Sequence, residues 1–204
     1  MDKKTGFVLS NILMLVFSIF VTIKTKGKLP ITKECFIGPL IILVLLILLY
    51  DYEPLIYDKE KAKKGEVWRI LTYNLVHTTL IHLFFNFTGL ILIWILFGNH
   101  FNVMNFLTVF LICSITCGLG VMRPSTHICH GLSGILMGLF IFGALKDIKD
   151  KQKIGYLLLF LIIIKIIREQ IYGSNMTDVL DCDIGTDIHL CGIMGGITSF
   201  YLLK

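Results

Sequence analysis

The sequence predicts an all-α, polytopic membrane protein, because it is strongly apolar and its apolar residues are clustered in long runs. Of its 204 residues, 55% are hydrophobic and only 16% are charged, and the mean hydropathy is +0.81. A soluble domain averages roughly 45–50% apolar and about 25% charged residues. The stretch 156–164 has no polar face, whereas the helices of a soluble bundle alternate polar and apolar faces.

Seven apolar runs are the predicted spans. Crossing a bilayer takes about 20 mostly apolar residues, and shorter runs suffice when flanking side chains reach the interface. The runs are 7–23, 36–50, 79–97, 103–121, 133–145, 154–167 and 188–203. The basic residues lie in short loops between them, as topology signals do, so the net charge of +5 does not indicate a nucleic-acid partner. The expected surroundings are a lipid bilayer.

Loop charges orient the predicted spans, because lysine-rich loops face the cytoplasm. Residues 146–153 hold four lysines and are predicted to be cytoplasmic. Residues 172–188 hold four aspartates and no Lys or Arg, so this loop is predicted to face outward. Counting backward along the chain makes 51–76 an outer loop.

The first two runs allow more than one arrangement. Four lysines in 24–35 favour a cytoplasmic connection, which makes 36–50 the first core span and 7–23 an extra leading span, seven in all. The alternative uses 7–23 as the first core span and lays 36–50 in the outer loop. A signal peptide at 7–23 ranks lowest, since no small-x-small cleavage site follows it. We therefore divide the chain into an extra segment with its basic loop, 1–35, and a core domain, 36–204.

Polar side chains inside the spans are candidate functional residues, because they are costly to place in a bilayer. His82 and Asn86 are four apart and share one helical face. Ser133 and His189 lie at the outer starts of their runs. The predicted topology puts all four residues in the outer half of the bilayer, although they are far apart in the sequence.

Small residues indicate how Ser133 and His189 could meet. Each of their two runs carries a GxxxG pattern, which lets membrane helices approach closely. The glycines are Gly134, Gly138, Gly192 and Gly196. A serine beside a histidine is the minimum activated nucleophile, and His82 and Asn86 could then donate hydrogen bonds to an anionic intermediate.

Each of these residues also has a purely structural interpretation. A serine between glycines is commonly a packing residue, a histidine in a span is commonly hydrogen-bonded structure, and His82 with Asn86 could hold helices together for only about 1 kcal/mol. Their common depth is what favours the catalytic interpretation.

The other polar residues give weaker signals. His77, five residues before His82, would lie on another face of a continuous helix. His127, Cys129 and His130 resemble half a metal site, but no second half lies nearby in the sequence, so no metal is predicted. Lys165 and Arg168 are expected to snorkel to the interface. Asn175 begins a glycosylation sequon, and a disulfide between Cys129 and Cys182 is one option in the outer loops.

Several motifs together resemble the rhomboid family of intramembrane serine proteases. Residues 68–86 read WRILTYNLVHTTLIHLFFN, similar to the family's WR-x-x-T followed by H-x-x-x-x-H-x-x-x-N. Residues 131–134, GLSG, match its GxSG, and 189–192, HLCG, match its H-x-x-G. The resemblance extends over about 52–203, and the stretch before Trp68 looks closest to animal-type rhomboids.

The resemblance implies a six-helix core with a water-filled cavity opening outward and a Ser133–His189 dyad. It assigns oxyanion stabilisation to His82, Asn86 and the Ser133 backbone N–H. Residues with structural roles would be Trp68 and Arg69, which order the outer loop, and the motif glycines Gly131, Gly134 and Gly192. Substrates would be single-pass membrane proteins, and no metal or organic cofactor is expected. The expected location is the plasma membrane or a secretory membrane, or the inner membrane of a bacterium.

The chain departs from the family pattern at two places. Many relatives carry a tyrosine four residues after the serine, where its ring stacks on the catalytic imidazole, and this chain has Met137. Residues 97–101 lack the usual carboxylate, so we expect the inner loop to be held differently. A catalytically inactive relative that binds or escorts membrane clients is the alternative function, and a transporter would need inverted repeats that are not seen.

Overall fold

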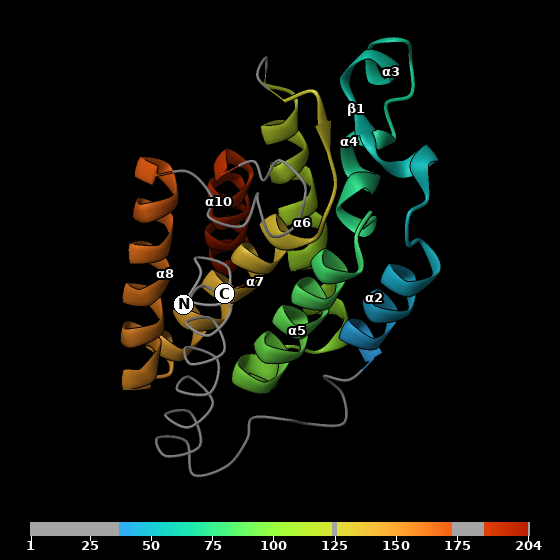
Figure 1. Cartoon of the computed structure of the whole chain (residues 1–204). Coiled ribbons are helices and arrows are strands. Elements are labelled where there is room, and N and C mark those ends of the chain that lie inside the picture. The colour runs from blue at the N-terminus through green and yellow to red at the C-terminus, as the bar shows by residue number, and fades with distance from the viewer. Residues whose placement is uncertain (1–36, 124–125, 173–185, 204) are drawn as a thin grey trace, which may run out of the picture.

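The computed structural model describes residues 37–123, 126–172 and 186–203. The run 7–23, the sequon at Asn175 and Cys182 lie outside these residues. The arrangement of the elements is shown in Figure 1.

Long helices dominate the described part of the chain, and each corresponds to one of the predicted apolar runs. They are α2 (Ile37–Leu48), α5 (Leu80–Phe97), α6 (Val103–Val121), α7 (Ser133–Lys149), α8 (Lys153–Tyr172) and α10 (Thr186–Leu202). The predicted all-α membrane fold is confirmed. Two helical stretches, 80–100 and 103–121, are long and apolar enough to cross a bilayer by themselves. The number of spans stays a prediction.

Polar caps set where two of these helices begin. The Thr79 side chain accepts a hydrogen bond from the His82 backbone N–H (3.2 Å) at the start of α5. The Asn102 side chain accepts one from the Asn105 N–H (2.8 Å) at the start of α6. Such caps satisfy N–H groups that have no acceptor within the first helical turn.

Helix α7 is the central element, and it packs against α5, α6, α8 and α10 (Figure 1). Helix α2 packs on α5 and α6 at one side of the bundle. Large apolar side chains remain exposed on the outward faces, including Phe84 on α5, Leu119 on α6 and Phe160 on α8. A lipid environment accounts for an apolar exterior of this extent, which would be unusual in a soluble monomer.

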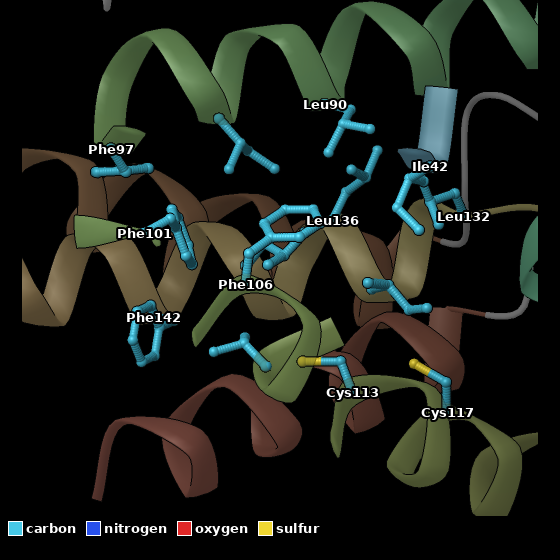
Figure 2. Packing of buried hydrophobic residues seen from close by; sticks show 14 of the residues in the cluster. Ile42, Leu90, Phe97, Phe101, Phe106, Cys113, Cys117, Leu132, Leu136 and Phe142 are labelled. Carbon is cyan, nitrogen blue, oxygen red and sulfur yellow. The ribbon is translucent and has the colours of Figure 1, made fainter. Parts of the chain in front are cut away.

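The interior is filled by tightly packed aliphatic and aromatic side chains, some of which Figure 2 shows. The Phe101 ring stacks on Phe142 with ring centroids 5.3 Å apart. Cys113 and Cys117 of α6 are fully buried. Their thiols lie near the α10 backbone, with Cys113 Sγ 3.8 Å from the Gly192 oxygen and Cys117 Sγ 3.7 Å from the Ile188 oxygen. The two cysteines are therefore part of the α6–α10 contact.

The predicted outer loop is built from short elements. They are η2 (Glu53–Leu55), β1 (Tyr57–Asp58), α3 (Lys59–Lys63), α4 (Arg69–Thr72) and η3 (Tyr73–Leu75). Strand β1 pairs antiparallel with β2 (Ile128–Cys129), with Tyr57 opposite Cys129. This small ribbon, which the sequence patterns did not predict, ties the loop to the segment that leads into α7.

The opposite end of the bundle has a buried contact between a histidine and a carboxylate. The short helix η4 (Gly98–His100) follows α5, and His100 Nε2 lies 2.7 Å from Asp147 Oδ1 of α7. Both side chains are almost completely buried. The loop after α5 is thus held by a carboxylate from a different helix.

Candidate functional site

Ser133 and His189 meet at the end of the bundle where α7 and α10 begin. Ser133 Oγ lies 2.9 Å from His189 Nε2, a distance that fits a hydrogen bond. His189 is buried, whereas Ser133 is partly accessible. A hydroxyl hydrogen-bonded to an imidazole can transfer its proton to that ring as it attacks an electrophile.

The glycine faces of α7 and α10 allow this contact. A Cβ atom added to Gly192 would collide with the Gly134 backbone oxygen, and one added to Gly196 would collide with the Gly138 oxygen. The helices therefore touch through backbone along both GxxxG patterns, which is the approach that their spacing predicts. This close contact brings the first turns of the two helices together.

Glu169, near the end of α8, contacts the other nitrogen of the same imidazole. Its Oε2 atom lies 2.8 Å from His189 Nδ1, and its Oε1 atom pairs with the Lys165 ammonium. Lys165, which was expected to snorkel, has a partner for its ammonium in Glu169, one turn further along α8. Arg168 is exposed, as a snorkelling side chain would be.

His82 and Asn86 lie on the buried face of α5, each 3% exposed. A Cβ atom at Gly131, two residues before Ser133, would collide with the His82 ring. The His82 imidazole is therefore directly beside the backbone that leads into the serine. Asn86 donates from Nδ2 to the His82 carbonyl oxygen (3.1 Å), and the amide has a second N–H to offer.

The backbone before Ser133 is held in an unusual conformation. Gly131 has φ +112°, a region that residues with a side chain rarely adopt. Its N–H donates to the Tyr73 carbonyl oxygen (3.0 Å). The next N–H, that of Leu132, points to His77 Nε2 at 3.4 Å. Tyr73 and His77 of the loop before α5 thus help to fix the turn that presents the serine.

The imidazole rings of His77, His82 and His130 pack against one another beside this turn. The His77 and His82 ring centroids are 4.8 Å apart, and those of His82 and His130 are 5.5 Å apart. The helical-wheel argument that separates His77 from His82 was wrong, because α5 begins only at Leu80. Burial lowers the pKa of His77 to about 3 and also lowers the pKa of His130. Both rings outside the helix are therefore neutral near pH 7.

The first turn of α7 is suited to an anion. Ser133 is the first residue of the helix, so its N–H and that of Gly134 have no acceptor within the helix. The positive end of the helix dipole lies at the same place. An oxyanion formed beside Ser133 would meet these donors.

Arg69 organises the outer loop from a buried position. Its guanidinium donates to the Glu53 and Ile56 carbonyl oxygens, both at 2.7 Å, and its Nε donates to Glu66 Oε2 at 2.7 Å. Trp68 is half exposed and donates from its indole to the Pro54 carbonyl oxygen (3.1 Å). Hydrogen bonds from Trp68 and Arg69 therefore stabilise the loop beside the site.

Sequence reasoning missed Glu169, because the stretch 156–164 has no polar face and does not show which side of α8 is buried. The buried positions of α8 repeat at helical spacing, at Ile154, Leu158, Ile162 and Ile166. Glu169 continues that stripe, so its carboxylate points into the bundle rather than to the lipid. A carboxylate on the buried face of a membrane helix is a functional candidate by default.

In the described residues, no group of three or more His, Cys, Asp or Glu side chains is arranged so that it could hold a metal ion.

Residues 64–204 match the protein-family model described as Rhomboid domain. The match covers α4 to α10, and so includes all the residues of the Ser133 site.

Proposed function

This chain belongs to the rhomboid family of membrane-embedded proteins, and from that premise we propose that it is an intramembrane serine endopeptidase with Ser133 as nucleophile and His189 as general base. The observation that carries the proposal is the 2.9 Å contact between Ser133 Oγ and His189 Nε2 in a family that acts on membrane proteins. The substrates would be single-pass membrane proteins, cleaved in the outer half of the bilayer.

The first half of the reaction forms an acyl-enzyme. Ser133 Oγ attacks the carbonyl carbon of the scissile peptide while its proton passes to His189 Nε2. The carbonyl oxygen becomes an oxyanion, which the N–H groups at the start of α7 stabilise together with the side chains of His82 and Asn86. His189 then donates its proton to the leaving amine, and the C–N bond breaks.

The second half releases the new carboxyl end. A water molecule attacks the acyl-enzyme carbonyl while His189 Nε2 accepts its proton. Collapse of this second tetrahedral intermediate returns the proton to Ser133 Oγ, and the free enzyme is restored. Three neighbouring features support this sequence of steps: the buried imidazole, the partly accessible serine and the unpaired donors of a helix N-terminus.

The alternative function is that of an inactive relative that binds membrane clients. Such a protein needs no hydrogen-bonded serine and histidine, so the geometry of Ser133 and His189 favours the protease. The same experiment separates the two functions.

The test is cleavage of a model transmembrane substrate by the purified protein in lipid vesicles. Ser133→Ala and His189→Ala are each expected to lower turnover roughly 10⁴-fold or more, as in soluble serine proteases. Ser199→Ala is the control, because Ser199 is another serine of the helix bundle, is fully buried and donates only to the Gly195 carbonyl oxygen (2.8 Å). Cleavage that survives Ser133→Ala would exclude the mechanism, and a folded wild type that binds substrate without cutting it would favour the escort function.

A further inference from the structure

We propose that Glu169 is a positioning residue for His189, so that the site works as a Ser133–His189–Glu169 triad and not as a dyad. The proposal rests on the proposed function, because it assigns Glu169 a role in that reaction. Three observations support it: which atoms meet, where Glu169 lies on α8, and what would otherwise orient the imidazole.

The contact between Glu169 and His189 decides which nitrogen carries the proton. An ionised carboxylate only accepts hydrogen bonds, so a bond of 2.8 Å between Glu169 Oε2 and Nδ1 requires the hydrogen on Nδ1. Neutral imidazole then has a lone pair on Nε2, facing Ser133 Oγ at 2.9 Å. This is the tautomer that a general base needs, and the carboxylate also stabilises the imidazolium that forms during attack.

Burying the Glu169 carboxylate on α8 costs desolvation free energy unless the carboxylate is paired. The side chains of His189 and Glu169 are only 5% and 13% exposed. Lys165, one turn earlier, binds the remaining carboxylate oxygen, so both oxygens have a cationic or N–H partner. Buried ionic groups persist only when they are paired and hydrogen-bonded in this way.

A simple surface pair with Lys165 does not explain the geometry. An i,i+4 pair between Lys165 and Glu169 could form on any exposed face of α8 and would stabilise the helix by only a few tenths of a kcal/mol. Here the helix directs the carboxylate toward the bundle, and its second oxygen reaches across to α10. The contact with His189 is the one that links two helices.

Two other side chains near His189 that could orient its imidazole do not do so. Asp187, the nearest carboxylate on α10, is paired with Arg123 of α6 at 2.6 Å. Position 137, where the family resemblance implied an aromatic ring stacked on the imidazole, holds Met137. In the part of the chain that the structure describes, Glu169 Oε2 is the acceptor that contacts His189 Nδ1.

The experiment compares three α8 variants of the full chain in two measurements. Glu169→Gln removes the charge but keeps the side-chain shape, and its amide can also donate to Nδ1 and so stabilise the wrong tautomer. Glu169→Asp keeps the charge on a shorter stem. Arg168→Gln is the matched control, because it changes the charge of the adjacent, exposed residue. The measurements are cleavage kinetics in vesicles and ¹⁵N NMR of the His189 ring, which reports the tautomer without any substrate.

The proposal predicts a change in kcat together with a change in tautomer. Glu169→Gln should lower kcat roughly 10²- to 10⁴-fold with little change in KM, and should shift the His189 ring toward the Nε2–H form. Glu169→Asp should restore part of kcat and the Nδ1–H form. Arg168→Gln should match the wild type in both measurements.

Two results would overturn the proposal, and a third would overturn the proposed function. An unchanged His189 tautomer in both Glu169 variants overturns the proposal even if kcat falls. Glu169 would then affect kcat only through the stability of the folded protein. An unchanged kcat in both variants overturns it as well. If the tautomer shifts as expected but neither the wild type nor Arg168→Gln cleaves any substrate, the protease function is wrong, while the Glu169–His189 contact stands.

Discussion

At the scale of single residues, the site depends on polar contacts between side chains that the sequence places far apart. Ser133 and His189 could be predicted from their motifs, because GxSG and H-x-x-G each mark the residue directly. Glu169 could not be predicted in the same way. Its importance comes from the rotation of α8 about its axis, which only packing against α7 and α10 determines.

The contact between Gly131 and His82 was also beyond the sequence patterns. The GxSG motif includes Gly131, but it does not indicate that the His82 ring of α5 fills the space where a side chain at this position would lie. That contact joins the turn before Ser133 to α5.

Gly131→Ala is predicted to damage the site more than an equivalent backbone change elsewhere. The alanine methyl group would push against the His82 ring, and the positive φ would cost at least about 1 kcal/mol. We expect turnover to fall about 10²-fold, the typical effect of losing one oxyanion donor. The measurement is cleavage in lipid vesicles.

Gly65→Ala is the matched control for this prediction. Gly65 has φ +108°, close to the +112° of Gly131, and a Cβ there would meet no atom within 4 Å. It therefore carries the same backbone strain without the collision. Equal activity of the two variants would show that His82 and Gly131 are not coupled.

At the scale of the elements, the apolar runs predicted the helices well because a membrane helix is recognisable from composition alone. The outer loop was predicted only as a loop. Its short helices and its strand are stabilised by long-range contacts of the Arg69 guanidinium and by pairing with β2, and neither has a periodic sequence signal. The sequence predicted that the loop after α5 is held differently, but it did not indicate that His100 contacts Asp147 of α7.

Gly192→Ala is predicted to weaken the α7–α10 contact. The added methyl group would meet the Gly134 backbone, which cannot move aside without shifting a helix. Overpacking of this kind typically costs about 1–3 kcal/mol. The measurement is the thermal unfolding midpoint of the purified protein in detergent.

Gly89→Ala provides the comparison, because it makes the same chemical change in the interior of another helix. A Cβ at Gly89 would meet only the end of the flexible Leu136 side chain. Alanine also has a higher helix propensity than glycine by about 1 kcal/mol. We expect Gly89→Ala to leave the midpoint unchanged or raise it, and equal destabilisation by both variants would contradict the packing account.

At the scale of the whole molecule, the bundle has two different ends. The Ser133 site lies at the end where α7 and α10 begin, and the lysine-rich connection between α7 and α8 lies at the other end (Figure 1). Loop charge predicted this separation, because lysines are retained on the cytoplasmic side. The number of spans could not be decided in the same way, since 1–36 lie outside the described residues.

The orientation can be measured with epitope tags inserted after Lys64, at the end of α3, or after Asp150, between α7 and α8. We expect antibody to reach the first tag in intact cells and the second only after permeabilisation, because the site should open outward. The reverse pattern would contradict the predicted topology but would leave the geometry of the site unchanged.

The central claim is that Ser133 is an activated nucleophile, and covalent labelling tests it most directly. The purified wild-type protein would be treated with a fluorophosphonate, and the modified residue would be located by peptide mass spectrometry. We predict an adduct on Ser133 that forms in the wild type and is lost in His189→Ala, since the base can then no longer accept the proton. A folded wild-type protein that acquires no adduct on Ser133 would contradict the account.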